Sequence, residues 1–291
     1  MRKTLYVVLG PTAVGKTQLS LSLAERLGSP IISADSRQMF RDLPIGTAAP
    51  TAAEQQRVPH HFVGQLALDA YYSAAQYEQE ALALIDHLFA THSALVVSGG
   101  SMLYIDALCH GIDALPTISA QVRAEVLQRY EEKGLDHLLD ELRLHDPEYY
   151  EVVDRRNAKR VIHALEIIYE SGTTYTSLRL GERKQRPFDI VKIGLQRPRE
   201  ELFDRINRRT TQMVEDGFIE EARAVYPFRH LNSLNTVGYK ELFQHFDGHW
   251  PLDMALDRIR KNTRVYAKKQ MTWFAKDSTI RWQHPDEPLQ L

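Results

Sequence analysis

Residues 10–17 read Gly-Pro-Thr-Ala-Val-Gly-Lys-Thr, a complete G-x-x-x-x-G-K-[ST] phosphate-binding loop. The apolar run 5–9 precedes this loop and the apolar-periodic segment 19–27 follows it, which is the strand–loop–helix setting that the motif requires. Glycines let backbone N–H groups point inward at an anion, and the positive end of the following helix adds to the attraction. These flanks disfavour the alternative of a turn that only links a strand to a helix. The loop therefore predicts a bound phosphate, but not which phosphate.

Two further apolar runs, 30–34 and 94–97, are typical of strands, and the segment 72–89 between them has helical spacing. Strands that alternate with helices predict an α/β fold with a doubly wound parallel sheet. Ligands of such sheets bind beyond the carboxyl ends of the strands. We therefore expect the phosphate-binding loop and the segments 35–38 and 98–101 to converge on one crevice.

The pattern changes along the rest of the 291-residue chain. From residue 116 to about 154 it is helical and acidic, a basic helix opens at 155–160, and the run 190–195 returns to a strand pattern. The sequence therefore predicts a P-loop-type doubly wound parallel sheet with a helical insertion domain and a helical C-terminal region. We expect the first part of the α/β core at 1–112, the insertion at 113–187, and the core completion with basic C-terminal helices at 188–291.

Charge and composition narrow the classes of function. The chain is net −2, yet Arg205, Arg208 and Arg209 share one helical stretch and the stretch 252–274 is strongly basic. Several basic segments on a net acidic chain favour contact with a nucleic-acid backbone, although any single one is also explained as a solvated face. The single cysteine suits a reducing cytoplasm, and no apolar run approaches the ~18 residues of a membrane span.

The segment 94–97 ends in Ser98 and lacks the strand-end carboxylate with which ordinary P-loop nucleotidases help to place Mg²⁺. Asp35 is instead the acid at a strand end, and it is a candidate general base facing the phosphates. An aspartate that only caps a turn is the alternative. Arg205 and Arg209 are four residues apart and share a helix face, so either can reach a phosphate at the loop.

Several motifs together resemble the bacterial tRNA dimethylallyltransferases, in order along nearly the whole chain. They are the loop 10–17, Asp-Ser-Arg-Gln at 35–38, Ile-Gly-Thr-Ala at 45–48, Pro-His-His at 59–61, Gly-Gly-Ser-Met-Leu-Tyr at 99–104, Val-Gly-Tyr at 237–239, Asn-Thr-Arg at 262–264 and Gln-Met-Thr-Trp-Phe at 270–274.

The resemblance implies transfer of a dimethylallyl group from dimethylallyl diphosphate to N6 of adenosine 37 in the tRNA anticodon stem-loop, with Mg²⁺ as cofactor. It implies that the insertion contacts tRNA and that the enzyme is a cytoplasmic monomer. Asp35 would be the base, Lys16 and Thr17 would grip the diphosphate with help from Arg209, and Thr17 would bind Mg²⁺, partly through water. The implied diphosphate- or nucleotide-binding residues are Gly10, Pro11, Thr12, Ala13, Val14, Gly15, Lys16 and Thr17, a motif that also leaves ATP binding open. The implied tRNA-binding residues are Asp35, Ser36, Arg37, Gln38, Ser101, Arg123, Lys159, Arg160, Val161, Ile162, His163, Thr236, Val237, Gly238, Tyr239, Lys240 and Glu241.

Two positions depart from the family pattern. Ala49 stands where the family often has lysine, and His163 stands where some members carry arginine. Both changes put a tRNA contact in doubt and leave the core chemistry untouched. Two other functions remain as alternatives: a P-loop kinase of a small acceptor with Asp35 as base, and a nucleotide-regulated RNA-binding protein without catalysis.

Overall fold

A computed structural model describes residues 3–289 of the chain. The chain forms two compact units, one made of Met1–His110 with Gln185–Leu291 and the other of Gly111–Lys184. The second unit overlaps most of the stretch 113–187 that the sequence analysis assigns to an insertion. The predicted domain bounds and the tRNA contact of the insertion remain predictions. Among the described residues, no helix combines the length and the apolar character that crossing a membrane requires.

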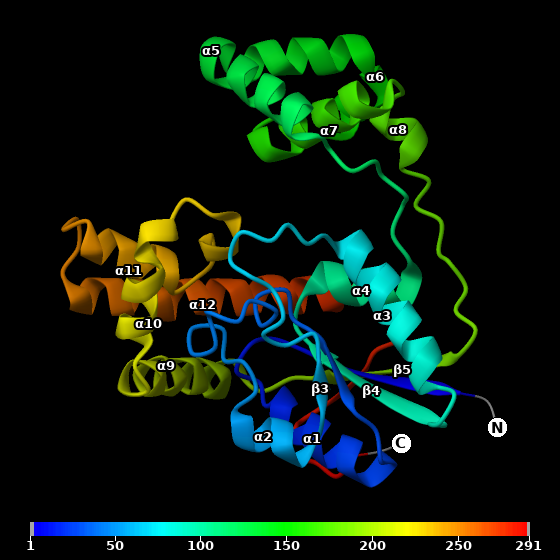
Figure 1. The fold of residues 1–291 in the computed structure, drawn as a ribbon, viewed down its shortest axis with the longest axis vertical. Helices are drawn as coiled ribbons and strands as arrows, with labels where there is room; N and C mark the ends of the chain where they lie inside the picture. Colours follow the sequence, from blue (N-terminus) through cyan, green and yellow to red (C-terminus); the bar gives the residue numbers. More distant parts are fainter. Residues whose placement is uncertain (1–2, 290–291) are drawn as a thin grey trace. The chain divides into compact units, whose positions relative to one another are not determined.

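The first unit is built on a six-stranded sheet with the order β3-β2-β4-β1-β5-β6, and every neighbouring pair is parallel (Figure 1). The strands are β1 (Thr4–Leu9), β2 (Ile31–Ala34), β3 (His60–His61), β4 (Ala94–Gly99), β5 (Asp189–Leu195) and β6 (Arg281–Gln283). The predicted parallel α/β fold is confirmed. Because β2, β4 and β1 are neighbours, the three loops that follow them leave the sheet at the same edge.

Helices cover both faces of the sheet, which explains why the strands read as continuous apolar runs. Leu5, Val7 and Leu9 of β1 pack toward one set of helices, while Val8 packs toward the other. The first set is α3 (Ala74–Leu88) and α4 (Met102–His110), and the second is α1 (Lys16–Leu27) and α9 (Arg199–Glu215). Helix α12 (Leu252–Phe274) contributes Phe274 to the first cluster and Ala267 to the second. Each fully buried aliphatic side chain contributes about 1.5–3 kcal/mol. The alternation along the strands therefore fixes which side of the sheet each helix covers.

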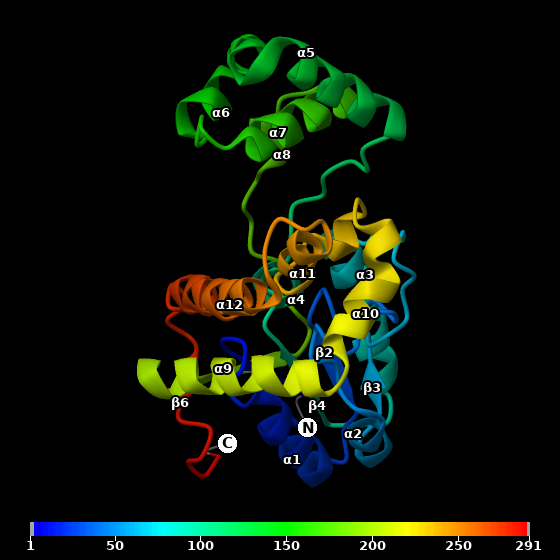
Figure 2. The same ribbon diagram turned by 90° about the vertical axis from the view of Figure 1, so that its left-hand side faces the viewer.

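The short helices of the C-terminal part lie beside α9 and α12 (Figure 2). A third apolar cluster of buried side chains joins them to the ends of these two helices. The short helices are α10 (Phe218–Val225), the 3₁₀ turns η1 (Tyr226–Phe228) and η2 (Asn232–Leu234), and α11 (Tyr239–Phe246); α2 (Ala52–Arg57) lies earlier in the chain. Phe218 and Tyr239 meet edge to face, with ring centroids 5.2 Å apart. A Cβ built on Gly46 would lie 2.3 Å from the Phe218 ring, so only glycine lets the segment 45–48 approach this cluster.

The second unit is a small helical domain with its own apolar core. It contains α5 (Ala120–His145), α6 (Pro147–Val152), α7 (Ala158–Ser171) and α8 (Tyr175–Leu178). Gly134 interrupts α5 with a φ of 79°, a conformation that favours glycine. Leu138 and Leu142 of α5 pack against Leu165 of α7, and all three side chains are fully buried. This core explains the apolar spacing of the insertion sequence.

Asp146 stabilises this unit through a buried carboxylate. Its Oδ1 accepts hydrogen bonds from the Tyr149 N–H at 3.0 Å and from the Thr176 hydroxyl at 2.8 Å, and its Oδ2 accepts from the Thr176 N–H at 2.8 Å.

We expect Asp146→Ala to lower the free energy of unfolding of this unit by about 2–4 kcal/mol, because the change removes a helix cap and leaves buried donors without partners. Amide hydrogen exchange of α6 and α8 measures the effect. Asp154→Ala, at an exposed position of the same unit, is the control, and equal protection in both variants would contradict the assignment.

Candidate active site

A cavity of about 330 Å³ lies where β1, β2 and β4 end. The phosphate-binding loop, Asp35 and Arg209 all line it, so the structure brings together three of the features that the sequence singled out. The predicted site residues at its wall are Thr12, Ala13, Gly15, Lys16, Thr17, Asp35, Gln38 and Arg209. Thr47, Ala48 and His60, from the segments between β2 and β3 and from β3 itself, also line this cavity.

Backbone conformation at two glycines shapes the loop. Gly10 has a φ of 147° and Gly15 a φ of 115°, both in the range that side chains disfavour. A Cβ on Gly10 would lie 2.6 Å from the Leu195 carbonyl oxygen, so this position also needs glycine for close packing against β5. Gly15 has no side chain with which to cap α1. The first N–H groups of that helix are therefore left for an anion.

Three cationic side chains donate hydrogen bonds to the loop. Lys16 Nζ donates to the carbonyl oxygens of Gly10 at 3.1 Å and Pro11 at 2.8 Å. From α9, Arg205 Nε donates to the Ala13 carbonyl at 2.8 Å and Arg209 Nη2 donates to the Thr12 hydroxyl at 2.7 Å. Arg208 points elsewhere and pairs with Asp204 of its own helix at 2.6 Å. The expected shared face of Arg205 and Arg209 is confirmed.

Two of these cations have lowered pKa values. Burial lowers the pKa of Lys16 to about 8, with Arg209 adding to the decrease and Asp35 opposing it. Burial likewise lowers the pKa of Arg209 to about 10, again opposed by Asp35. Positive charge is therefore held in a site that disfavours it, and an anion bound beside these groups would relieve that cost.

The Asp35 loop is tied to other segments of the first unit. Asp35 Oδ1 accepts from the Arg37 N–H at 3.0 Å, and Ser101 Oγ accepts from the Ser36 N–H at 2.8 Å. Arg37 donates in turn to the carbonyl oxygens of Asn232 and Ser233, each at 3.0 Å. These bonds place the predicted residues of 35–38 and 101 next to the turn that leads into 236–241.

Some predicted contact residues are already engaged within the protein. Gln38 Nε2 donates to the Ala48 carbonyl at 2.9 Å, and Gln38 Oε1 accepts from the Ser33 hydroxyl at 3.4 Å. Thr236 and Val237 are half-buried, Gly238 is buried at the start of α11, and Lys240 is exposed. An adenine edge would therefore have to displace the bonds of Gln38, whereas Lys240 is open to a phosphate.

Three members of the predicted tRNA-binding set are corrected by the structure. Val161 and Tyr239 are fully buried and Glu241 is 4% exposed, so none of these side chains lies at the surface. Val161 packs in the core of the second unit, and the Tyr239 hydroxyl donates to Glu221 at 2.6 Å. Glu241 accepts from the Gly238 N–H and from Asn262 Nδ2, each at 2.7 Å. Their side chains support their segments from within and are not open to RNA.

The other predicted residues of the second unit are accessible. Lys159, Arg160 and His163 are exposed on α7 and Ile162 is half-buried. Arg123 Nε lies 3.3 Å from Glu166 Oε1, and His163 Nδ1 lies 3.7 Å from the other oxygen of the same carboxylate. Lys159 and Arg160 therefore carry exposed positive charge at the beginning of α7.

The sequence placed the segment 98–101 at the crevice, but the fold reveals contacts of Ser98 and Glu221 that no sequence pattern indicated. Ser98, at the end of β4, hydrogen-bonds to Ser20 of α1 with 2.7 Å between the hydroxyl oxygens, where an ordinary P-loop nucleotidase has a carboxylate. Glu221 accepts from the N–H groups of Ile45 and Gly46, each at 2.8 Å, and thereby holds the turn beside the cavity. A lone serine or glutamate carries no spacing signal, so only the fold reveals these roles.

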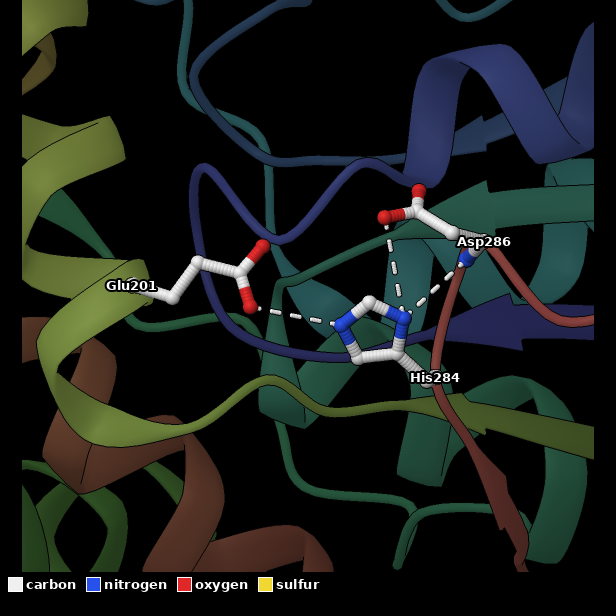
Figure 3. A group of neighbouring side chains, drawn as sticks. All are labelled: Glu201, His284 and Asp286. Carbon is white, nitrogen blue, oxygen red and sulfur yellow. Dashed lines mark hydrogen bonds and ion pairs between the residues drawn. The ribbon is translucent and has the colours of Figure 1, made fainter.

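One group of potential metal ligands lies outside the cavity. Glu201, His284 and Asp286 have ligand atoms within 4.8 Å of one another (Figure 3). Arg197 donates to Glu201 and to both carboxylate oxygens of Asp286, at 2.9 and 2.8 Å in the latter case. Its guanidinium already balances these carboxylates, and its Nε donates to the Val14 carbonyl at 2.8 Å. The group is therefore an ion-pair cluster that supports the phosphate-binding loop.

A parallel α/β sheet whose central strand ends in an anion-binding loop, with a carboxylate across the same cavity, defines a protein of the P-loop class. Comparison with known proteins is more specific. The family model described as IPP transferase matches residues 38–277, and the chain therefore belongs to the IPP transferase family.

Individual relatives agree with this membership. The chain is 59% identical to tRNA dimethylallyltransferase 1 of Phocaeicola vulgatus over 291 residues, which covers 100% of this chain and 97% of the relative. It is similar to the crystal structure of the full-length tRNA isopentenylpyrophosphate transferase of Bacillus halodurans, with a TM-score of 0.70 and 37% identity over 97% and 90% of the two chains. A eukaryotic dimethylallyltransferase acting on tRNA shares the fold at 24% identity and a TM-score of 0.82, over 96% and 73% of the two chains.

Proposed function

We propose that this protein transfers a dimethylallyl group from dimethylallyl diphosphate to N6 of adenosine 37 in tRNA, acting as a monomer in the cytoplasm. The single observation that carries the proposal is the cavity shared by the anion-binding loop and Asp35. The relatives named above act on tRNA by their printed names, and they supply the class of acceptor.

The loop side of the cavity supplies the grip on the diphosphate. Lys16, Arg209 and the N–H groups at the start of α1 would surround its oxygens, and they would stabilise the negative charge that develops as the carbon–oxygen bond breaks. Such donors act most strongly when they are fixed before the reaction, as the bonds of Lys16 and Arg209 to the loop ensure.

Residues for a metal ion are present at the same wall. Thr17 is exposed to the cavity, and the hydroxyls of Ser20 and Ser98 lie nearby; these hard oxygen donors suit Mg²⁺. With one hydroxyl from the loop, the ion would retain water and diphosphate oxygens as its other ligands. When bound, Mg²⁺ would neutralise charge on the leaving diphosphate.

Asp35 acts on the nucleophile. The exocyclic amine of adenine is weakly nucleophilic because its lone pair is delocalised into the ring. As the N6–carbon bond forms and the carbon–diphosphate bond breaks, Asp35 accepts the proton that N6 loses. The bond from the Arg37 N–H to Asp35 Oδ1 orients the carboxylate, and Oδ2 is the oxygen that we assign to the proton. An adenosine must leave its stack to reach this site.

The accessible predicted residues supply the RNA contacts. Arg37, Lys240, Lys159 and Arg160 carry positive charge, and cations of this kind position a nucleic acid through its phosphates. Ser36, Gln38, Thr236, Val237, Arg123, Ile162 and His163 complete the accessible set. Ser101 and Gly238 are buried, and they belong to the proposed set through the segments that they hold in place.

Incubation of the protein with unmodified tRNA, Mg²⁺ and radiolabelled dimethylallyl diphosphate tests the proposal. We expect label in the RNA, at the adenosine next to the anticodon after digestion to nucleosides. A parallel reaction with γ-labelled ATP tests for a kinase. Label from ATP in a small acceptor, with none from the prenyl donor in RNA, would overturn the proposal.

The lowered pKa of Lys16 predicts a pH dependence. The protonated amine binds the diphosphate, so kcat/KM for dimethylallyl diphosphate should fall as pH rises through about 8, the pKa of Lys16 in the free protein. Lys16→Arg keeps its charge far above this pH, so the ratio of wild type to variant cancels the titration of the substrate itself. A ratio that stays constant between pH 7 and 9.5 would contradict the role of the amine.

A further inference from the structure

Gln270 is a buried polar side chain that the proposed chemistry does not use. It lies on α12, is 2% exposed, and carries no charge. Its Oε1 accepts from the Thr12 N–H at 2.9 Å, and its Nε2 donates to the Gly100 carbonyl at 2.8 Å. One amide therefore links the phosphate-binding loop to the loop after β4.

The hydrogen bond between the Thr12 N–H and Gln270 fixes part of the loop that would bind the diphosphate. Because the Thr12 N–H is held by Gln270, the orientation of this peptide is fixed from outside the loop. The hydroxyl of the same residue accepts from Arg209 Nη2 at 2.7 Å. Gln270, Thr12 and Arg209 thus form a continuous series of contacts from α12 to α9, and Thr12 is the shared member.

Gly100 shows how closely this amide is fitted. A Cβ built on Gly100 would lie 2.5 Å from Gln270 Nε2 and 3.6 Å from Lys16 Nζ. The φ of Gly100 is not in the positive range, so its backbone does not require glycine. Space for the Gln270 amide is the physical reason for glycine at this position.

We propose that Gln270 is a positioning residue for diphosphate binding: its amide fixes the Thr12 peptide and thereby the place of Arg209 relative to the phosphate-binding loop. The inference rests on the proposed function only for its effect on transfer, since diphosphate binding can be measured alone. A purely structural role would instead lower stability and leave ligand affinity unchanged.

Calorimetric titration with inorganic diphosphate and Mg²⁺ tests the positioning role. Gln270→Met keeps the size of the side chain and removes both hydrogen bonds. We expect its Kd to rise at least ~10-fold, because small misplacements of binding groups are costly. Thr263→Val is the matched control, since Thr263 is also buried on α12, and its Kd should stay within about twofold of wild type. Unchanged affinity in Gln270→Met would overturn the proposal.

Two further variants separate positioning from misfolding. Gly100→Ala displaces the amide without altering Gln270, and it should weaken diphosphate binding in the same direction even if Gln270→Met folds poorly. Thr12→Val removes the acceptor of Arg209. If Gln270 acts through Thr12, the double variant Thr12→Val/Gln270→Met should have about the same Kd for diphosphate as the single variant that binds diphosphate less tightly. If the two increases in Kd multiply in the double variant, Gln270 does not act through Thr12.

The transfer reaction gives a separate result. With wild type active, Gln270→Met should raise KM for dimethylallyl diphosphate and lower kcat, while the Kd for tRNA stays within about twofold. If wild type transfers no prenyl group, the proposed function fails, and the diphosphate titration still decides the role of Gln270.

Discussion

Asp35→Ala should reduce prenyl transfer to tRNA at least ~100-fold while tRNA affinity stays within a fewfold of wild type. General-base catalysis contributes about 10²–10⁴-fold. Asp35 lines the same cavity as the anion-binding loop and interacts electrostatically with Lys16 and Arg209. Single-turnover assays with saturating dimethylallyl diphosphate measure the chemical step, and filter binding measures the tRNA complex.

Two further variants make this result specific. Asp35→Asn keeps an oxygen that can accept from the Arg37 N–H, so it preserves the loop and removes only the base. Asp86→Ala changes an exposed aspartate of α3 and should leave turnover unchanged. If Asp35→Asn turns over at the wild-type rate, Asp35 is not the base.

Lys16→Ala should lower kcat/KM for dimethylallyl diphosphate by about 10²–10³-fold, the size of effect seen when one preorganised group that stabilises a developing negative charge is lost. Part of the loss is structural, because Lys16 also donates to the Gly10 and Pro11 carbonyl oxygens. Steady-state kinetics at saturating tRNA measure the change.

The control for Lys16→Ala is Lys133→Ala, which removes the same charge from an exposed position of α5. It should leave kcat/KM within about twofold. If Lys16→Ala instead abolishes ATP hydrolysis and leaves use of the prenyl donor intact, the loop serves a nucleotide and the proposed function is wrong.

The fold was predictable because its signals are local and repeated. The apolar runs at 5–9, 94–97 and 190–195 lie within strands, the run 30–34 contains β2 (Ile31–Ala34), and the segment 72–89 with helical spacing contains α3. Parallel strands buried on both faces produce such runs directly. The two edge strands, β3 and β6, were not predicted. They have only two and three residues, too few to show a period.

The site was predictable only in part. Glycine spacing identifies the anion-binding loop, and the acid at a strand end identifies Asp35. Both could be placed at the site because ligands of parallel sheets bind beyond the carboxyl ends of the strands. Gln270, Glu221 and Ser98 reach the site from distant parts of the chain, and their roles depend on tertiary packing. For Tyr239 the family motif predicted an RNA contact, but the structure places its ring fully buried against Phe218.

The departing diphosphate and the attacking amine are proposed to meet in one cavity. The most direct test of this proposal is a single turnover of the protein with dimethylallyl diphosphate, Mg²⁺ and tRNA that carries either adenosine or unsubstituted purine at position 37. We expect one diphosphate released for each N6-prenylated adenosine, and no release with the purine tRNA, which lacks the amine. Diphosphate release that proceeds equally with both tRNAs, or a prenyl group found elsewhere than N6, would contradict it.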